Sequence, residues 1–519
     1  MQANKKSSAG RLMLLFVLIA LGTTLFFWQL AGRPKKWFQW GQPDALTQVL
    51  QLIQERYVDS LAADSLVGLS LDSLVARLDP HSTYLNPLEL QKANEDLSDR
   101  FAGIGIGYGW LRDTLTVSFV YAGSPSEAAG LKVGDQLLAI GTTSLLGFQK
   151  YPDTVLRLIR GPIGSIASLT VSSQGKIRPL TIRRAAIATP AVTHAHLIDD
   201  SIGYIKLIKF STGSYRECVS ALDSLIKKGM RSLILDLRSN GGGFLQEAID
   251  LADEFLADDR LIVYTEGAHL QKRSYLCKRP GLFEEGKLTV LINESSASAS
   301  EVLAGALQDW CRAKIVGRRS FGKGLVQEQF ELSNDAALRL TVARYYTPLG
   351  RCIQRPYPSS FLPFGSDGQL NNADNLPSQM KKYRSPCGDT LIGGGGIRPD
   401  LEILNEEVQS DNPAVFHFLN SPDFIIWSYR YFTQYNVRID SFKDPAQWAR
   451  LQPDNQMKRY FLQEAIPDSI SLRPSDWSRI QLEVYLQGIR LQRSEAEFFR
   501  LQQLKDPFVL SAIQLLKSH

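Results

Sequence analysis

The stretch from Leu291 to Gln327 constrains the fold and chemistry of this chain more than any other segment. The apolar run from Leu288 to Ile292 predicts a buried strand, and the apolar spacing from Glu301 to Trp310 predicts a helix. The serines and alanines between them therefore lie on a strand-to-helix turn, where backbone N–H groups point outward and a side chain can be exposed. A hydroxyl on such a turn can attack a carbonyl while a neighbouring amide stabilises the oxyanion.

A serine needs a base to become a nucleophile, and Lys323 is the candidate. It lies on a glycine-flanked turn, 25 residues after Ser298. Burial would lower the pKa of Lys323 and leave the amine neutral, as Ser–Lys catalysis requires. A small-residue turn and a surface lysine without chemistry are the alternative, but both segments at this spacing favour a serine hydrolase with a lysine base.

The two segments, Ser-Ala-Ser-Ala-Ser-Glu (296–301) and Phe-Gly-Lys-Gly-Leu-Val-Gln (321–327), carry a resemblance. The chain resembles the carboxy-terminal processing (tail-specific) serine peptidases from about Ala45 to Asp400. In that family the middle serine is the nucleophile, the lysine is the general base, and the glutamine four residues on orients the lysine. The resemblance implies these roles for Ser298, Lys323 and Gln327.

Composition excludes several other classes of protein. With 519 residues the chain is too long for one core and is expected to form three or four domains. Its formal charge of +5 is small and no long basic run stands out, so nucleic-acid binding is not favoured. Five scattered cysteines without a Cys-x-x-Cys pair predict neither a disulfide framework nor a zinc knuckle, and leave open whether any two are bridged.

The N-terminal region predicts a membrane segment followed by helices. The apolar block from Leu12 to Ala31 is long enough to span a bilayer, and Lys5, Lys6 and Arg11 precede it. No clear small-x-small cleavage site follows, which favours an uncleaved single-pass anchor over a signal peptide. Together with the resemblance, this predicts a catalytic part outside the cytoplasm, in the periplasm. We expect the membrane segment within residues 1–36 and a helical region over residues 37–100.

Residues 101–184 are similar to a PDZ domain, because short strand patterns alternate with turn signals and Ser124 to Leu131 matches a PDZ motif. The glycine-rich start of this region lacks the third glycine of a dinucleotide fingerprint. In PDZ recognition, loop N–H groups bind a C-terminal carboxylate and the peptide adds as a strand. The resemblance assigns the helix from Tyr151 to Arg160 to one wall of that groove, although this helix could simply pack on its own sheet; a gating role for Arg160 is a hypothesis. It assigns the carboxylate loop to Gly103, Ile104, Gly105 and Ile106.

Residues 185–404 alternate strands and helices, which predicts an α/β core of the ClpP/crotonase-like type. The run from Leu237 to Gly243 ends a buried strand, and its glycines let backbone amides approach a ligand closely. The resemblance implies an oxyanion hole formed by the amide of Ala299 with that of Gly242 or Gly243, and the choice between the glycines stays open. A tight strand-to-helix turn without this role is the alternative.

The remaining segments carry weaker signals. Residues 405–519 predict a helical C-terminal domain that could serve dimerisation, packing or adaptor binding, and Ser359 to Pro386 predicts an irregular insertion. His81 lies on an Asp-Pro turn and is more simply structural than catalytic. His194 and His196 would share one face of a strand, but nothing near them completes a ligand set, so no metal or cofactor is expected.

The sequence thus predicts a multidomain α/β serine endopeptidase that cleaves extracytoplasmic proteins near their C-termini by a Ser–Lys mechanism. Its expected partners are protein or peptide tails, bound by the PDZ domain, and the membrane, through the N-terminal segment; a homodimer is a further candidate. The alternatives are a catalytically silent PDZ scaffold and a crotonase-like acyl-CoA enzyme. The physiological substrate and the cleavage register stay open.

Overall fold

The computed structural model describes residues 45–58, 63–111, 113–173, 175–257, 259–356, 381–403, 412–439, 455–464 and 471–518. The chain divides into a first unit, Met1–Ser73, and a second unit, Leu74–His519. The predicted anchor from Leu12 to Ala31 lies outside the described residues, as does most of the predicted insertion from Ser359 to Pro386. Within the described ranges, no helix is both long and apolar enough to cross a bilayer.

Helices form the N-terminal region, as predicted. Helix α2 (Ala45–Arg56) belongs to the first unit, and α3 (Ala63–Val75) extends into the second. The Asp-Pro turn then leads into the short strand β1 (Thr83–Leu85), which pairs antiparallel with β18 (Ala337–Tyr346). Helix α4 (Pro87–Leu97) begins with a capping box, in which the Asn86 side chain accepts from the first-turn amides.

A PDZ domain follows, built on a sheet of order β3-β4-β5-β7-β8 with β6 paired to β5. Its apolar core includes Leu115, Val117 and Leu137 from the strands and Val155 and Ile159 from α6. Strands β2 and β9 pair with each other, so the chain enters and leaves this domain through one two-stranded ribbon. The elements are β2 (Arg100–Gly103), β3 (Ile106–Leu111), β4 (Thr114–Val120), α5 (Pro125–Ala128), β5 (Gln136–Ile140), β6 (Thr143–Ser144), the 3-10 turn η1 (Phe148–Lys150), α6 (Pro152–Ile159), β7 (Ile166–Ser173), β8 (Lys176–Arg183) and β9 (Ala185–Ala188).

The centre of the second unit is a six-stranded sheet of order β10-β11-β12-β15-β16-β21. All neighbouring pairs are parallel except β10 with β11. Parallel sheets need both faces covered, and β12 and β15 are buried almost throughout. The strands are β10 (Val192–Leu197), β11 (Ile202–Leu207), β12 (Ser232–Asp236), β15 (Lys287–Ile292), β16 (Lys314–Gly317) and β21 (Leu401–Glu402).

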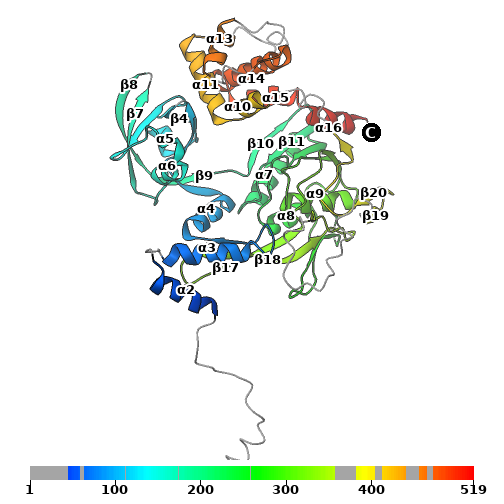
Figure 1. The fold of residues 1–519 in the computed structure, drawn as a ribbon. Helices are drawn as coiled ribbons and strands as arrows, with labels where there is room; N and C mark the ends of the chain where they lie inside the picture. The colour runs from blue at the N-terminus through cyan, green and yellow to red at the C-terminus, as the bar shows by residue number, and fades with distance from the viewer. Residues whose placement is uncertain are drawn as a thin grey trace, which may run out of the picture. The chain divides into compact units, whose positions relative to one another are not determined.

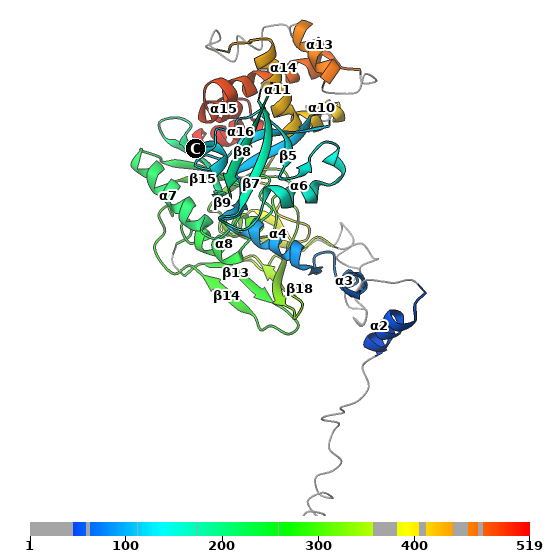
Figure 2. The same cartoon turned by 90° about the vertical axis from the view of Figure 1, so that its left-hand side faces the viewer.

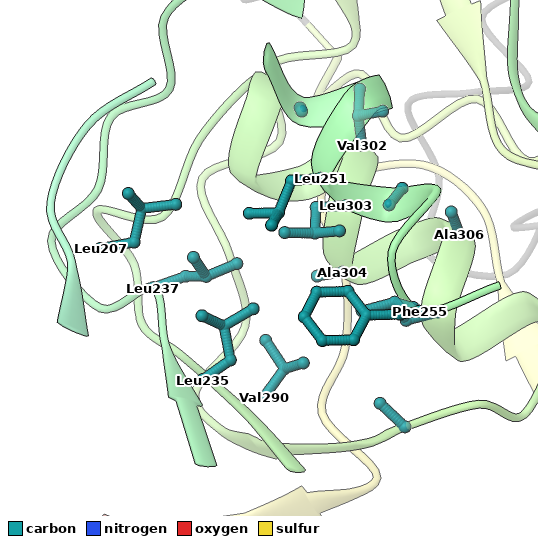
Figure 3. Close-up of a cluster of buried hydrophobic side chains, with 14 of the residues drawn as sticks. Leu207, Leu235, Leu237, Leu251, Phe255, Val290, Val302, Leu303, Ala304 and Ala306 are labelled. Carbon is teal, nitrogen blue, oxygen red and sulfur yellow. The ribbon is translucent and has the colours of Figure 1, made fainter. Parts of the chain in front are cut away.

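One face of this sheet packs against three helices, α7 (Ser214–Lys227), α8 (Leu245–Ala252) and α9 (Ala299–Asp309), which lie next to one another in Figure 1. Figure 3 shows the contact: Leu235, Leu237 and Val290 from the strand side face Leu251 of α8 and Val302 and Leu303 of α9, with Phe255 closing the cluster. Helix α9 is buried along its whole length. The rigid packing of α9 fixes the turn at its N-terminus.

The other face packs against the last helix of the chain, α16 (Pro507–Lys517), which lies beside β15 in Figure 2. Its apolar residues Phe508, Val509 and Ala512 contact Ile234 and Leu291, which alternate along their strands with residues of the first face. The sheet is therefore covered on both sides by residues far apart in the sequence.

A second sheet of order β1-β18-β13-β14, with β17 also paired to β18, adjoins the core. Its further strands are β13 (Leu261–Glu266), β14 (Arg273–Leu276) and β17 (Leu325–Glu331), and a separate hairpin is formed by β19 (Lys382–Arg384) and β20 (Thr390–Ile392). A disulfide joins Cys311, which follows α9, to Cys387 in this hairpin.

The C-terminal region is helical, as predicted, and it packs around Trp427, whose side chain is fully buried. Residues 413–434 form two helices, because Ser421 and Pro422 begin a new helix. The helices are α10 (Pro413–Leu419), α11 (Pro422–Gln434), α13 (Asn455–Glu464), α14 (Pro474–Gln492) and α15 (Glu495–Gln503). The domain boundaries stay predictions.

Candidate active site

Ser298 lies at the turn between β15 and α9, at the N-cap of the helix. Its backbone has a φ of 55°, a left-handed conformation that is uncommon for a residue with a side chain and that often occurs at functional sites. The side chain is half-buried, so it can face a substrate.

Glu301, three residues after Ser298, fixes the turn by hydrogen bonds. Its carboxylate is 1% exposed and accepts four hydrogen bonds. The donors are the Ser298 amide (2.8 Å), the Ser320 hydroxyl (2.5 Å), the Gly322 amide (2.7 Å) and the Lys323 amide (2.9 Å). Burial raises the pKa of Glu301, whereas these donors favour its ionised form. One carboxylate therefore joins the two motifs that are 25 residues apart.

Tyr345 joins the same two residues on their carbonyl side. It is 2% exposed, and its hydroxyl proton is shared between the carbonyl oxygens of Ser298, at 3.0 Å, and of Lys323. Because Oε2 of Glu301 accepts from both amides and Tyr345 donates to both carbonyls, the backbones of Ser298 and Lys323 are fixed side by side. The structure thus brings together the predicted nucleophile and the predicted base.

The Lys323 amine is partly buried and points to Gln327. Its Nζ donates to Oε1 of Gln327 at 2.6 Å, and Nε2 of Gln327 donates to the carbonyl oxygen of His81. Burial lowers the pKa of Lys323, and the charge of Arg339 lowers it further, while Asp79 and Glu301 act in the opposite direction. Within the described residues, no hydrogen bond joins Nζ to the Ser298 hydroxyl.

His81 contributes its backbone, held by the Asp-Pro turn. Both amides after the turn, of His81 and Ser82, donate to Oδ1 of Asp79 at 2.8 Å, and the Ser82 hydroxyl donates to Oδ2 at 2.6 Å. Thr341 of β18 donates to the same carboxylate at 3.2 Å. Although burial acts against it, these bonds lower the pKa of Asp79. The turn is therefore a rigid support for Gln327.

The glycine run (Gly241–Gly243) lies directly against the serine turn (Asn293–Ser298). A methyl group added at Gly242 would be 2.9 Å from Cβ of Ser298 and 3.0 Å from the Ala299 nitrogen. Buried Asn240 joins the two segments: its carbonyl accepts from the Ala297 amide at 3.0 Å and from the Ser300 hydroxyl at 2.9 Å. The Gly242 amide donates to the Asn240 side chain at 2.9 Å, so this amide is already engaged.

In the PDZ domain, the predicted carboxylate loop turns at Gly105, where φ is 85°. The carbonyl oxygens of Ile104 and Gly105 accept from the amides of Ser126 and Tyr121, at 3.1 Å each. In a trans peptide the N–H points opposite to the C=O, so the amides of Gly105 and Ile106 face away from those partners. The loop backbone thus has the direction that anion binding needs.

The histidine pair on β10 is engaged by the C-terminal helices. The ring of His194 lies 3.4 Å from that of Phe499, and Nε2 of His196 is 2.8 Å from Oε1 of Gln503. Burial lowers the pKa of His194 to about 4. Among the described residues, the one group of three metal-ligand side chains is Cys311, Cys387 and Asp389, and its two thiols form the disulfide.

Sequence reasoning assigned no role to several residues of this site. Glu301 was part of the quoted motif, and the pattern of serine followed three residues later by glutamate was an available signal of a helix N-terminus. The roles of Tyr345, of the His81 carbonyl and of Asn240 had no signal, because each acts through contacts with residues distant in the sequence.

Comparisons with known proteins place this geometry in a family. A model of peptidase family S41 matches residues 201–357, and a PDZ domain model matches residues 116–172. The carboxy-terminal-processing protease of Bartonella bacilliformis is 33% identical over 374 residues, which cover 71% of this chain and 82% of that protein. The chain belongs to peptidase family S41, among the carboxy-terminal-processing proteases.

One further relative and one solved structure have similar names. The carboxyl-terminal-processing protease of Synechocystis is 37% identical over 310 residues, covering 57% of this chain and 71% of that one. The solved structure of the photosystem II D1 C-terminal processing protease is 24% identical, with a TM-score of 0.37, and covers 70% of this chain and 88% of that chain.

Proposed function

We propose that this carboxy-terminal-processing protease cleaves peptide bonds with Ser298 as nucleophile and Lys323 as general base. The observation that carries the proposal is the shared acceptor: one oxygen of Glu301 accepts from the amides of both residues. This arrangement holds the two backbones together, and burial with the nearby charge of Arg339 favours the neutral amine that a base needs. Gln327 orients that amine, and the His81 carbonyl fixes the direction of the Gln327 amide.

The reaction proceeds in two stages. Neutral Lys323 takes the proton of the Ser298 hydroxyl as Oγ bonds to the substrate carbonyl carbon, and the carbonyl oxygen becomes an oxyanion. The protonated Lys323 then gives its proton to the leaving amine, and an acyl-enzyme ester stays on Ser298. Water attacks the ester while Lys323 accepts its proton, and this proton returns to Oγ of Ser298 as the acid product leaves.

We assign the oxyanion hole to the first amide of α9, on Ala299, and to the glycine run. The N-terminus of a helix presents unpaired N–H groups and a positive dipole end. Because the Gly242 amide donates to Asn240, Gly243 is the better candidate for the second donor, and Gly242 allows the close approach of the two segments.

We place substrate recognition at the PDZ domain and the catalytic part outside the cytoplasm. The outward amides of Gly105 and Ile106 suit a C-terminal carboxylate. The disulfide between Cys311 and Cys387 supports an oxidising compartment such as the periplasm, since cytosolic proteins rarely keep structural disulfides. The apolar segment from Leu12 to Ala31 would then anchor the enzyme to the membrane.

The test is the Ser298→Ala variant, assayed on an internally quenched peptide with an apolar C-terminus that the wild-type enzyme cleaves. We expect no cleavage, an unchanged unfolding midpoint and unchanged binding of the same peptide by fluorescence anisotropy. Binding without cleavage would show that Ser298 is needed for cleavage and not for binding of the peptide. Cleavage by this variant at the wild-type rate would refute the assignment of Ser298.

A further inference from the structure

The last helix of the chain contacts the segment that leads into the glycine run. Asp506, the N-cap of α16, uses its two carboxylate oxygens for two different tasks. Oδ1 accepts from the amides of Phe508 (2.9 Å) and Val509 (3.4 Å) and so caps the helix. Oδ2 lies 2.7 Å from Nη2 of Arg238 and forms an ion pair.

Arg238 lies three residues before the first glycine of the run, and its side chain is held from both sides. The same guanidinium forms several hydrogen bonds with Asp236, of which Nη2 to Oδ2 is the shortest at 2.6 Å. Its planar face lies over the ring of Phe508, with 4.9 Å between Cζ and the ring centre. Helix α16 therefore supplies both an anion and an aromatic face to this one arginine.

The cluster around Arg238 is balanced in charge and shielded from water. Asp236 is fully buried, and the side chains of Lys206, Arg238 and Asp506 are less than one-fifth exposed. Lys206 lies 3.0 Å from Asp236 and also donates to the Arg238 carbonyl at 2.7 Å. Two cations thus face two anions, and loss of Asp506 would leave one cation without a counter-charge in a site where water screens little.

Hydrogen bonds connect the residues that follow Arg238 to the serine turn. Ser239, the next residue, donates its amide to the Asn293 side chain at 2.8 Å, and Asn293 starts the turn that carries Ser298. Asn240 then accepts from the Ala297 amide at 3.0 Å and orders Gly242. A series of contacts therefore connects the ion pair of Asp506 to the backbone that precedes the proposed oxyanion donor.

We propose that Asp506 is a positioning residue for catalysis: through Arg238, the C-terminal helix holds the glycine run in the geometry that stabilises the oxyanion. The inference rests on the proposed function, and it extends the peptidase site to a helix more than one hundred residues beyond the segment that matches the family model. It also predicts a specific kinetic effect, because the glycine run acts on the transition state more than on substrate binding.

Variants of Asp506 separate the ion pair from the helix cap. Asp506→Ser keeps a good N-cap and removes the charge, and Asp506→Asn keeps both the cap and the size of the side chain. We expect each to lower kcat about tenfold, less than the loss of a whole oxyanion donor, with KM unchanged. Affinity for a peptide aldehyde, whose adduct with Ser298 presents an oxyanion, should fall by the same factor. Asp506→Glu, which keeps the charge, should recover most of kcat.

Lys517→Ala is the matched control, because it removes the other ion pair of α16 to the core, to Asp199 at 2.9 Å. We expect wild-type kcat for this variant. Rates are referred to folded enzyme, counted by circular dichroism, so a loss of stability alone does not imitate the effect. A kcat for Asp506→Ser within twofold of wild type, or an equal loss in Lys517→Ala, would overturn the role of Asp506. Cleavage by Ser298→Ala would instead refute the proposed function.

Discussion

At the scale of single residues, the site depends on the pKa values of two neighbouring buried groups, the Lys323 amine and the Glu301 carboxylate. Burial and the charge of Arg339 lower the pKa of Lys323, although two carboxylates nearby raise it. Four hydrogen-bond donors favour the ionised form of Glu301, although burial raises its pKa. Because an ionised carboxylate favours the protonated amine, burial and the charge of Arg339 must outweigh Glu301 for the pKa of Lys323 to be lowered.

The activity should depend on pH. The active form of Lys323 is the free amine, so kcat/KM should rise as the pH rises through its lowered pKa, by about tenfold per unit below that value. Arg339→Gln removes a charge that lowers this pKa, so the acid limb of the profile should move to higher pH. Arg344→Gln, on the same strand but exposed, is the control and should leave the limb in place. A limb that moves to lower pH in Arg339→Gln would contradict the charge state proposed for Lys323.

The residues to which we assign direct chemical roles, and the supporting Gln327, could be proposed from the sequence, but the other supports could not. Ser298 and Lys323 carry reactive groups at a recognisable interval, so residue type and spacing pointed to them. The His81 carbonyl is a backbone group that any residue could supply, and Tyr345 contacts the site from a strand whose pattern indicates only burial. Such contacts depend on which strands pair, and sequence periodicity does not contain that information.

At the scale of elements, the turn between β15 and α9 and the glycine run before α8 form one unit. Gly242 adopts a φ of 98° and lies against the serine turn, so it needs both the conformational freedom and the small volume of glycine. Its neighbour Gly241 has nothing within 4 Å of an added methyl group. The two glycines therefore differ in what they tolerate.

Gly242→Ala should be much less active and less stable. Its methyl group would lie 2.7 Å from the Ala297 carbonyl oxygen, and the left-handed backbone adds a strain of about 1–3 kcal/mol in free energy of unfolding. We expect kcat/KM to fall by roughly 100-fold or more, because the serine turn must shift. The measurements are kinetics and urea unfolding, with Gly241→Ala as the control. Equal activity of the two variants would show that the close approach has no role.

Most core elements were predicted from periodicity within a few residues. The predicted strand from Leu288 to Ile292 and the predicted helix from Glu301 to Trp310 correspond to β15 and α9, because buried strands and helices have distinct apolar periods. Strand β1 was not predicted, since its three residues are too short for a pattern. The apolar pattern of α16 predicted a helix, but it did not show that this helix covers the central sheet.

At the scale of the whole molecule, a disulfide links two distant parts of the chain, and the number of cysteines alone could not predict which two are bonded. Cys311 and Cys387 are 76 residues apart, and Cys218, Cys277 and Cys352 take no part in this disulfide. An odd number of scattered cysteines leaves many pairings open, so proximity in the fold decides. The bond ties the end of α9, and hence the helix that begins at the active serine turn, to the hairpin β19–β20.

The bond should be measurable in two ways. Thiol titration in urea without reductant should find three free thiols per chain, and five after reduction. Replacing both Cys311 and Cys387 by serine should lower the free energy of unfolding by about 2–4 kcal/mol, since the unfolded chain regains the freedom of a long loop. Reductant should then have no further effect on that variant. Five free thiols before reduction would show that the bond is absent.

The central claim is that Ser298 and Lys323 act as one unit, and a double-mutant cycle on kcat/KM tests it most directly. Ser298→Ala, Lys323→Met and the double variant are assayed on the same peptide with equal amounts of folded enzyme. Each single variant should lose about 10⁴-fold or more, and the double variant should be no worse than either, because a unit can be broken only once. A Lys323→Met variant that retains wild-type kcat/KM, or losses that multiply in the double variant, would contradict the account.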